Sequence, residues 1–563
     1  MTRISVWAPN ADEVDVELFD GDDGASRRER LTPGDDGWWW HDCDAAPGTE
    51  YLLHLRAGDE HLTRIDPRAR EVTSSVGRAV IHADVEAAAA WSDADFVARP
   101  VNEWVIYELH PGTFGGSLHG AAERLQYLAD LGVTAVELMP VAEFAGEQSW
   151  GYNTSLPFAV ASSYGGPVAM RRFVDTAHSL GISVIVDVVY NHFGPSDLDL
   201  WRFDGWAEGH GGGVYFYNDW RAATPWGATR PDYGRTEVRR FLIDNALMWI
   251  EEYHVDGLRL DSTLHIRNAH GQGGGDGDLE DGWSFLQELT ATVRARHPDT
   301  VLIAEDLQDD PRITMPVEEG GLGFDLQWSA AFVHTVRGAL VELADEHRDL
   351  DAVVAAVLGG DDRRSRVVYT ESHDEVANGR TRVPAEIDPD APTSMHAFRR
   401  SVAGAMLVMA TPGVPMMFQG QEWGDEDWFD DSRDLQWGRL EERHGVVHLW
   451  ADLIRLRTGV DDRAGGLRGD EVACERSGPD GRVLLIRRWG IGGPESASVA
   501  IVNLGTQPVD GIELGFTESG WQCVFSSDWV GYHESGSDTE TLPAPGIAAI
   551  SPYGAALMVP LSA

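Results

Sequence analysis

Lysine is absent from this chain of 563 residues, so arginine supplies all 44 of its basic side chains. They are outnumbered by 92 acidic residues, which gives a formal net charge of -48. A surface of this sign repels nucleic-acid phosphates and anionic lipid, so we expect neither nucleic acid nor a membrane as a partner. Two origins of the missing lysine stay open: adaptation to a halophilic cytoplasm, in which salt screens the self-repulsion, and GC-rich codon usage.

If the acidic composition is an adaptation to salt, the melting temperature should rise with KCl concentration. The reason is that screening weakens the repulsion between carboxylates in the folded state. A series of melting curves in increasing KCl measures this, and highest stability in low salt would contradict the adaptation.

Cysteine and long apolar runs are also scarce. Cys43, Cys474 and Cys523 lie far apart and have no metal-ligand spacing, which is typical of free thiols in a reducing cytoplasm. One bridge, between Cys474 and Cys523, is the alternative. No apolar run approaches the roughly 18 residues of a transmembrane helix, and the opening MTRISVWAPN does not resemble a secretory signal. We expect a cytoplasmic protein, and its oligomeric state is left open.

The chain is long enough for several domains, and its pattern changes twice. Residues 1–95 alternate apolar and polar side chains between turn signals, which predicts a β-sandwich. Residues 96–462 alternate strands with amphipathic helices, which predicts an α/β fold, a (β/α)₈ TIM barrel. Residues 463–563 return to short strands and predict a second β-sandwich. A doubly wound open sheet is the alternative for the central part, but no G-x-G-x-x-G follows its first strand.

Two insertions interrupt the barrel pattern. Residues 193–235 are rich in tryptophan and glycine, and residues 267–282 are acidic and glycine-rich. Because loops on the catalytic face of a barrel set specificity, we expect both to shape the site. In the N-terminal region, Trp38, Trp39 and Trp40 are candidates for stacking on sugars, with burial in the core as the alternative.

Four short apolar runs each carry a carboxylate at or just past their end. VIVDVVYNH contains Asp187, GLRLD ends on Asp261, VLIAED contains Glu305 and VVYTESHD ends on Asp374. In a (β/α)₈ barrel, the carboxyl ends of all strands face the active site. Paired carboxylates on such a rim are the usual machinery for breaking a glycosidic bond.

The surroundings of these acids suggest different roles for them. Arg259 precedes Asp261 by two residues and so shares its face of the strand, where its charge would keep Asp261 ionised as a nucleophile. Glu305 follows an apolar run, and burial there would raise its pKa and favour the acid role. Asp374, beside His373, would hold sugar hydroxyls.

The segments DVVYNH, GLRLD, IAED and SHDE, in this order, resemble the four signature regions of glycoside hydrolase family 13, the α-amylase family. The resemblance implies a retaining mechanism on the α-glucosidic bonds of an α-glucan or malto-oligosaccharide. It implies that Asp261 is the nucleophile, Glu305 the general acid/base and Asp374 the transition-state stabiliser. The substrate-binding residues that it implies are Tyr152, Asp187, His192, Arg259 and His373.

Within this family, VWAPNADEVDVEL, VIYELHPGTF and FQGQEW look closest to α-glucan branching enzymes and malto-oligosyltrehalose trehalohydrolases. Both groups carry an N-terminal β-sandwich resembling a starch-type carbohydrate-binding module. SHDEV favours the branching enzymes, whereas PWG and DVVYNHFGP favour the trehalohydrolases. Ser262 to His265, after the nucleophile, fit neither group, and His265 resembles that of α-amylases. We expect branching activity, with trehalose release and α-1,4 hydrolysis as alternatives.

Two further functions were weighed. A metal hydrolase is disfavoured because the histidines are scattered without H-E-x-x-H spacing. The aspartate-rich stretches do not match an EF-hand loop, so no cofactor is expected and a structural calcium lacks support in the sequence. The 21 tryptophans would suit a non-catalytic glucan-binding protein, but such a protein should lack a catalytic acid, and all three are present.

Overall fold

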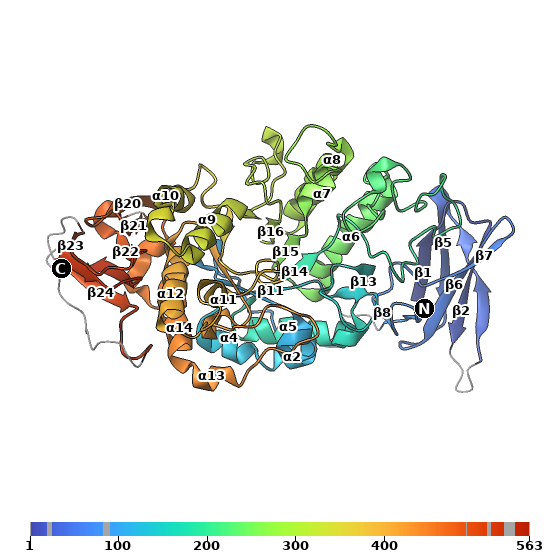
Figure 1. Ribbon diagram of the computed structural model, residues 1–563. Helices are drawn as coiled ribbons and strands as arrows, with labels where there is room; N and C mark the ends of the chain where they lie inside the picture. Colours follow the sequence, from blue (N-terminus) through green and yellow to red (C-terminus); the bar gives the residue numbers. More distant parts are fainter. Residues whose placement is uncertain are drawn as a thin grey trace.

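The structure is a computed structural model that describes residues 2–19, 25–82, 91–490, 492–514, 520–533 and 547–561. A central barrel lies between sheets formed by the N-terminal and C-terminal parts of the chain (Figure 1). This arrangement confirms the predicted fold class. Among the described residues, no helix has both the length and the apolar character needed to span a membrane.

Eight parallel strands close the barrel in chain order. Each is a short run of buried side chains, as expected when the barrel interior covers one face and helices cover the other. The strands are β10 (Ile106–Leu109), β11 (Ala135–Leu138), β14 (Ser183–Val188), β15 (Gly257–Leu260), β16 (Val301–Ala304), β17 (Leu326–Trp328), β18 (Arg366–Val368) and β19 (Val414–Phe418).

The barrel strands are connected by helices whose apolar faces are buried. In α6, for example, Val238, Phe241 and Leu242 are buried at the spacing of one helical face. The longer helices are α4 (Leu125–Leu131), α5 (Gly166–Ser179), α6 (Thr236–Tyr253), α8 (Glu280–Arg296), α9 (Ala330–Val341), α10 (Leu350–Leu358), α12 (Met395–Ala410) and α14 (His444–Thr458). Shorter ones are α2 (Pro111–Gly115), α3 (Leu118–Ala122), α7 (Thr263–Arg267), α11 (Val383–Ile387) and α13 (Arg439–Glu442).

The inside of the barrel changes from apolar to charged along its axis. The apolar part includes Ile106, Ala135, Ile185, Ile303, Leu326 and Val367. Because side chains alternate along a strand, the residue two positions later points inward again. On β10, β11 and β14 that residue is ionisable and almost fully buried, namely Glu108, Glu137 and Asp187, and Arg259 of β15 is the register partner of Asp187. A buried charged layer therefore lies beneath the face at the carboxyl ends of the strands.

The flanking sheets are antiparallel. The first N-terminal sheet has the strand order β1 (Thr2–Trp7), β5 (Trp38–Cys43), β4 (Thr32–Pro33). The second has the order β3 (Arg27–Arg30), β2 (Glu13–Phe19), β6 (Glu50–Ala57), β9 (Ala79–Val80), β8 (Glu71–Val72), and β7 (Glu60–Arg64) also pairs with β6. The larger C-terminal sheet has the strand order β20 (Glu471–Ser477), β21 (Val483–Trp489), β22 (Ser498–Asn503), β26 (Ala555–Pro560), β24 (Trp521–Ser526). A smaller sheet pairs β23 (Val509–Glu513) with β25 (Ile547–Ile550). The domain limits at 95 and 462 stay predictions.

The structure shows the burial of two N-terminal tryptophans and the state of two cysteines. Trp39 is buried in the core, whereas Trp40 is exposed beneath the guanidinium of Arg3, 4.8 Å from its ring centre. The bridge between Cys474 and Cys523 is not formed, because both are free thiols.

Candidate active site

A cleft of about 530 Å³ brings together most of the residues predicted to act on the substrate. Its lining includes Tyr152, His192, Asp261, His373 and Asp374. The other residues that line it were not predicted from the sequence: Gln148, Ser149, Trp150, Asn153, Pro195, Trp226, Asn378 and Asp431. A pocket at the carboxyl ends of barrel strands is where a (β/α)₈ enzyme places its active site.

Arg259, from β15, is the centre of the charged layer beneath the cleft. Its side chain is fully buried, and its Nη1 lies 2.6 Å from Asp187 Oδ2 and 2.9 Å from Asp261 Oδ1. Its Nη2 lies 3.1 Å from Glu305 Oε2. One guanidinium thus holds carboxylates from three neighbouring strands, and the predicted contact between Arg259 and Asp261 is present.

Asp261 immediately follows β15, and both of its carboxylate oxygens are held. Oδ1 contacts Arg259, and Oδ2 accepts a hydrogen bond of 2.8 Å from Asn191 Nδ2. The side chain is 10% exposed and lines the cleft. These bonds fix the direction of the carboxylate at the edge of the cleft. Asn191 was missed by the sequence analysis although it lies within DVVYNH.

Glu305 immediately follows β16 and is more deeply buried than Asp261. Burial raises its pKa to about 8, against the opposing charge of Arg259, and the nearby carboxylate of Asp261 raises it further. Its Oε2 also accepts a hydrogen bond of 2.7 Å from the backbone N–H of Ser262. Ser262 has a left-handed φ of 38°, which is uncommon outside glycine and often marks a functional site. A carboxyl that keeps its proton near neutral pH is suited to act as an acid.

Asp187, within β14, lies below Asp261 rather than beside the substrate. Its side chain is 1% exposed, and its Oδ2 accepts a hydrogen bond of 2.6 Å from the hydroxyl of Tyr152. Burial raises its pKa to about 7 although Arg259 opposes the shift. This position suits a supporting residue.

His373 and Asp374 come from the loop after β18, several residues past the strand end. The ring of His373 stacks on Tyr152 with 5.1 Å between ring centres, and its Nε2 lies 3.6 Å from Asp374 Oδ2. Burial lowers the pKa of His373, but the carboxylates of Asp374 and Glu108 outweigh it and raise the pKa to about 10. Asp374 is the most accessible of the acids, with its side chain 48% exposed.

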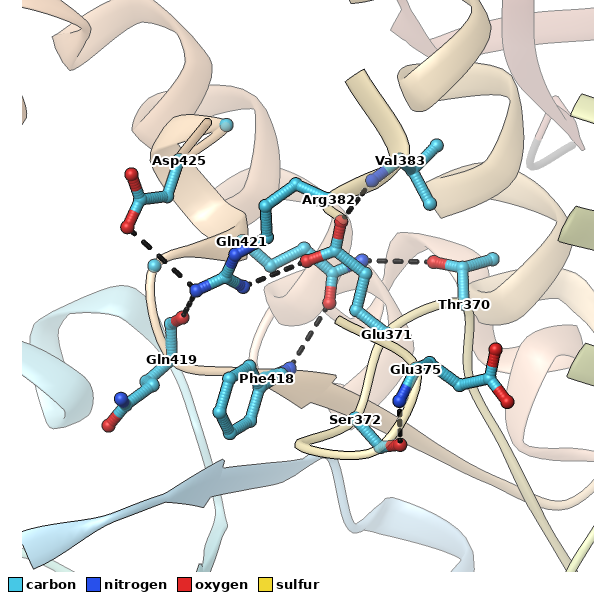
Figure 2. A network of polar contacts seen from close by, with 12 residues as sticks. Thr370, Glu371, Ser372, Glu375, Arg382, Val383, Phe418, Gln419, Gln421 and Asp425 are labelled. Atoms are coloured by element: carbon cyan, nitrogen blue, oxygen red, sulfur yellow. Dashed lines mark hydrogen bonds and ion pairs between the residues drawn. The ribbon is translucent and has the colours of Figure 1, made fainter. Parts of the chain in front are cut away.

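A buried polar network holds the loop that carries these two residues (Figure 2). Glu371 accepts hydrogen bonds from Arg382 Nη1 at 2.9 Å and from the backbone N–H of Val383 at 2.7 Å. Arg382 also donates to the carbonyl of Gln419, and Gln421 donates to Thr370. Removing one partner of a buried ion pair of this kind costs about 3–5 kcal/mol. The network thus fixes the backbone that leads into this loop.

His192 and Trp226 also line the cleft, and His265 packs against Trp226. Burial lowers the pKa of His192 to about 4, so its imidazole is neutral. It stacks on Trp226 with 4.6 Å between ring centres, and Trp226 packs edge-on against His265 at 5.0 Å. His265 Nδ1 lies 2.8 Å from Ser262 Oγ. Trp226 is 43% exposed, so part of its surface is free to contact a ligand.

The two loops singled out from the sequence meet at this side. Arg230, from the first loop, donates a hydrogen bond of 3.1 Å to the carbonyl of Ala269 in the second. Gly271 packs on His265 so closely that a Cβ atom would lie 2.4 Å from its Nε2, and its φ is +64°. Only glycine fits both requirements.

Comparison with known proteins agrees with this geometry. Residues 77–201 and 228–457 match the family described as the α-amylase catalytic domain. A 1,4-alpha-glucan branching enzyme of Corynebacterium efficiens is 31% identical over 94% of this chain and 75% of its own length. The enzyme of the same name from Marinobacter nauticus is 30% identical over 99% of this chain and 92% of its own.

Solved structures show the same fold. A pullulanase from Anoxybacillus sp. LM18-11, crystallised with maltotetraose, superposes with a TM-score of 0.77 at 21% identity, covering 99% of this chain and 86% of the other. The similarity extends through the barrel and both flanking regions. This chain belongs to the α-amylase family of glycoside hydrolases and glucanotransferases and is an enzyme of this class.

Proposed function

We propose that this protein is a 1,4-α-glucan branching enzyme, which cleaves an α-1,4 bond and transfers the released segment to a 6-hydroxyl group. The observation that carries the proposal is the shared guanidinium of Arg259, which holds Asp261 and Glu305 side by side beneath an open cleft. Retaining glycosidases need such close carboxyls, about 5 Å apart, because one of them bonds to the sugar. The named relatives support the choice of branching.

In the first step, Asp261 attacks the anomeric carbon while Glu305 gives its proton to the departing 4-oxygen. The products are a covalent β-glucosyl ester on Asp261, a shortened chain and an ionised Glu305. In the second step, Glu305 takes the proton of an acceptor hydroxyl, whose oxygen displaces Asp261 and restores the α-configuration. Asp374, exposed at the cleft, accepts hydrogen bonds from sugar hydroxyls as positive charge develops on the ring.

The acceptor must enter on the side of Glu305, because this residue removes its proton. Glu305 contacts Ser262, Ser262 contacts His265, and His265 packs against Trp226. These contacts link Trp226 to Glu305, and we propose that its exposed ring stacks on a glucose unit of the incoming chain. A site that binds a sugar acceptor favours transfer over hydrolysis, since the same intermediate otherwise reacts with water.

Replacing Trp226 with alanine should shift the products from transfer toward hydrolysis. Loss of one stacking surface, worth about 1 kcal/mol, should lower the ratio of new α-1,6 linkages to new reducing ends about five-fold. The ratio is measured on amylose by proton NMR and a reducing-end assay. Trp40→Ala, which removes a comparably exposed ring on β5, is the matched control. An unchanged ratio in Trp226→Ala would remove the acceptor role.

The function itself is tested by incubating the protein with amylose, maltoheptaose and a maltooligosyl-trehalose. New α-1,6 anomeric signals are the expected result. Free trehalose would indicate a trehalohydrolase, and reducing ends alone would indicate an amylase. Unchanged substrates in all three reactions would contradict the proposal.

We also propose that the protein works in the cytoplasm. The free thiols of Cys43, Cys474 and Cys523 and the acidic, lysine-free composition support this location. The dependence of the melting temperature on KCl concentration tests whether this cytoplasm is halophilic.

A further inference from the structure

Two glutamates that take no part in the proposed bond-breaking steps lie side by side inside the barrel. Glu108 of β10 and Glu137 of β11 are register partners in adjacent parallel strands, and each residue is 1% exposed. Two carboxylates at this spacing in a buried site cannot both be ionised without a large cost. Their hydrogen bonds show which of them carries the charge.

Glu108 is bound twice by His373. Its Oε2 accepts a hydrogen bond of 3.0 Å from the backbone N–H of His373, and its Oε1 is paired with the ring Nδ1. Both contacts suit a carboxylate that accepts two hydrogen bonds, and the ring contact places a proton on Nδ1. The other ring nitrogen, Nε2, is directed toward Asp374 and the cleft.

Glu137 has the opposite surroundings. Neither of its oxygens has a hydrogen-bond partner among the described residues. Burial and the neighbouring charge of Glu108 raise its pKa well above the ordinary value, so it is a neutral acid. Glu137 does not line the cleft.

We propose that Glu108 is a positioning residue for the reaction: it holds His373 as a cation whose Nε2–H donates a charge-assisted hydrogen bond to a sugar hydroxyl in the cleft. Such bonds are roughly twice as strong as neutral ones. Because Glu137 is neutral, Glu108 is the member of this pair that interacts with His373 as a carboxylate. The inference rests on the proposed glucan substrate and adds a residue that never touches it.

The charge on His373 depends on every ionisable group around it. Burial, Arg259 of β15 and a positive charge on His110 oppose protonation, whereas Glu108 and Asp374 favour it. The charge of Asp374 contributes more than that of Glu108 to the raised pKa of His373, but the Asp374 side chain is half exposed and therefore screened by water, whereas Glu108 is almost fully buried.

The wild-type enzyme sets the baseline. Glu305, with a pKa of about 8, must carry a proton to act as the acid, so kcat/KM should fall tenfold per pH unit above about pH 8. His373, with its pKa of about 10, stays protonated over most of this limb and contributes little to it.

Glu108→Gln keeps the shape of the side chain and removes its charge. The alkaline limb of kcat/KM should then move to lower pH by about one unit or more, because His373 now loses its proton in the working range. KM for amylose should rise more at pH 8 than at pH 6.

Glu137→Gln, an isostere of the neutral acid, is the matched control and should keep the wild-type profile. Glu108→Asp, which restores the charge, should return the limb toward its wild-type position.

A readout without substrate separates this inference from the proposed function. Ring ¹⁵N shifts of histidine-labelled protein, with His373 assigned by its loss in His373→Gln, should report an imidazolium at pH 9 in the wild type and a neutral ring in Glu108→Gln. A neutral His373 in the wild type, or identical titration in both proteins, overturns the inference whatever the activity. If Glu108→Gln does not fold, Glu137→Gln still tests the inference. A shift of the alkaline limb of kcat/KM in that protein would contradict the neutral state of Glu137. If His373 titrates as expected but the protein is inactive on all glucans, only the proposed function is contradicted.

Discussion

Replacing Asp261 with asparagine should lower kcat on amylose by at least about 1,000-fold while the melting temperature stays close to that of the wild type. The amide cannot form the glucosyl ester, so the first chemical step has no nucleophile. The side chain keeps its size, and Arg259 retains Asp187 and Glu305 as partners, so the charged layer should stay folded. Initial rates and thermal melts of the two proteins measure both effects.

Added azide identifies the role of Asp261. In Asp261→Gly, azide can enter the space left by the carboxylate and attack an activated donor, α-maltosyl fluoride, from the same face. The expected product is a β-glycosyl azide, formed with one inversion. Near-normal activity in Asp261→Asn, or an α-azide from Asp261→Gly, would contradict the assignment as nucleophile.

Replacing Glu305 with glutamine should give a loss of similar size on amylose but a much smaller one on α-maltosyl fluoride. Fluoride leaves without a proton, so the acid is needed only for the glucan. We expect at least about 1,000-fold loss of kcat on amylose and less than about tenfold loss in the rate of fluoride release in a single turnover. The covalent intermediate should then accumulate and be visible in the mass of the intact protein.

The comparison between the two donors contains its own control. A general loss of packing would reduce both rates alike, because both donors need the same cleft. Equal losses on amylose and maltosyl fluoride would therefore remove the acid role from Glu305. In Asp261→Asn, by contrast, both donors should be poor and no intermediate should form.

Much of the barrel was predictable because its strands are local features. VIVDVV, GLRL and VLIA are short apolar runs bounded by turns or charged residues, and each forms a strand as expected. The rhythm of strands and helices then predicts a barrel. Strand β17 has only three residues, Leu326–Trp328, and the sequence pattern did not identify it. A run this short has no measurable period, and its pairing with β16 and β18 defines it.

The site was predicted in part, and the missed residues have a common reason. Asp261 and Glu305 directly follow their strands, so their positions could be inferred from local sequence. Asp374 lies in a loop well beyond β18, and tertiary contacts such as the Glu371–Arg382 pair and the bonds between Glu108 and His373 hold that loop at the cleft. Trp226 and Glu108 reach the site through contacts with residues far away in the chain. No periodicity reports such contacts.

The sequence alone determined the fold class, the family motifs and the residue types available for acid–base and nucleophilic chemistry, because these depend on local alternation and on short segments in fixed order. The tertiary structure decided the surroundings of each carboxyl group. Asp261 contacts Arg259 and Asn191 at the edge of the cleft, Glu305 is buried enough for a pKa of about 8, and Glu137 has no hydrogen-bond partner among the described residues. The free energy of a charge depends on its distance to other charges and to water, and closing the barrel is what sets those distances.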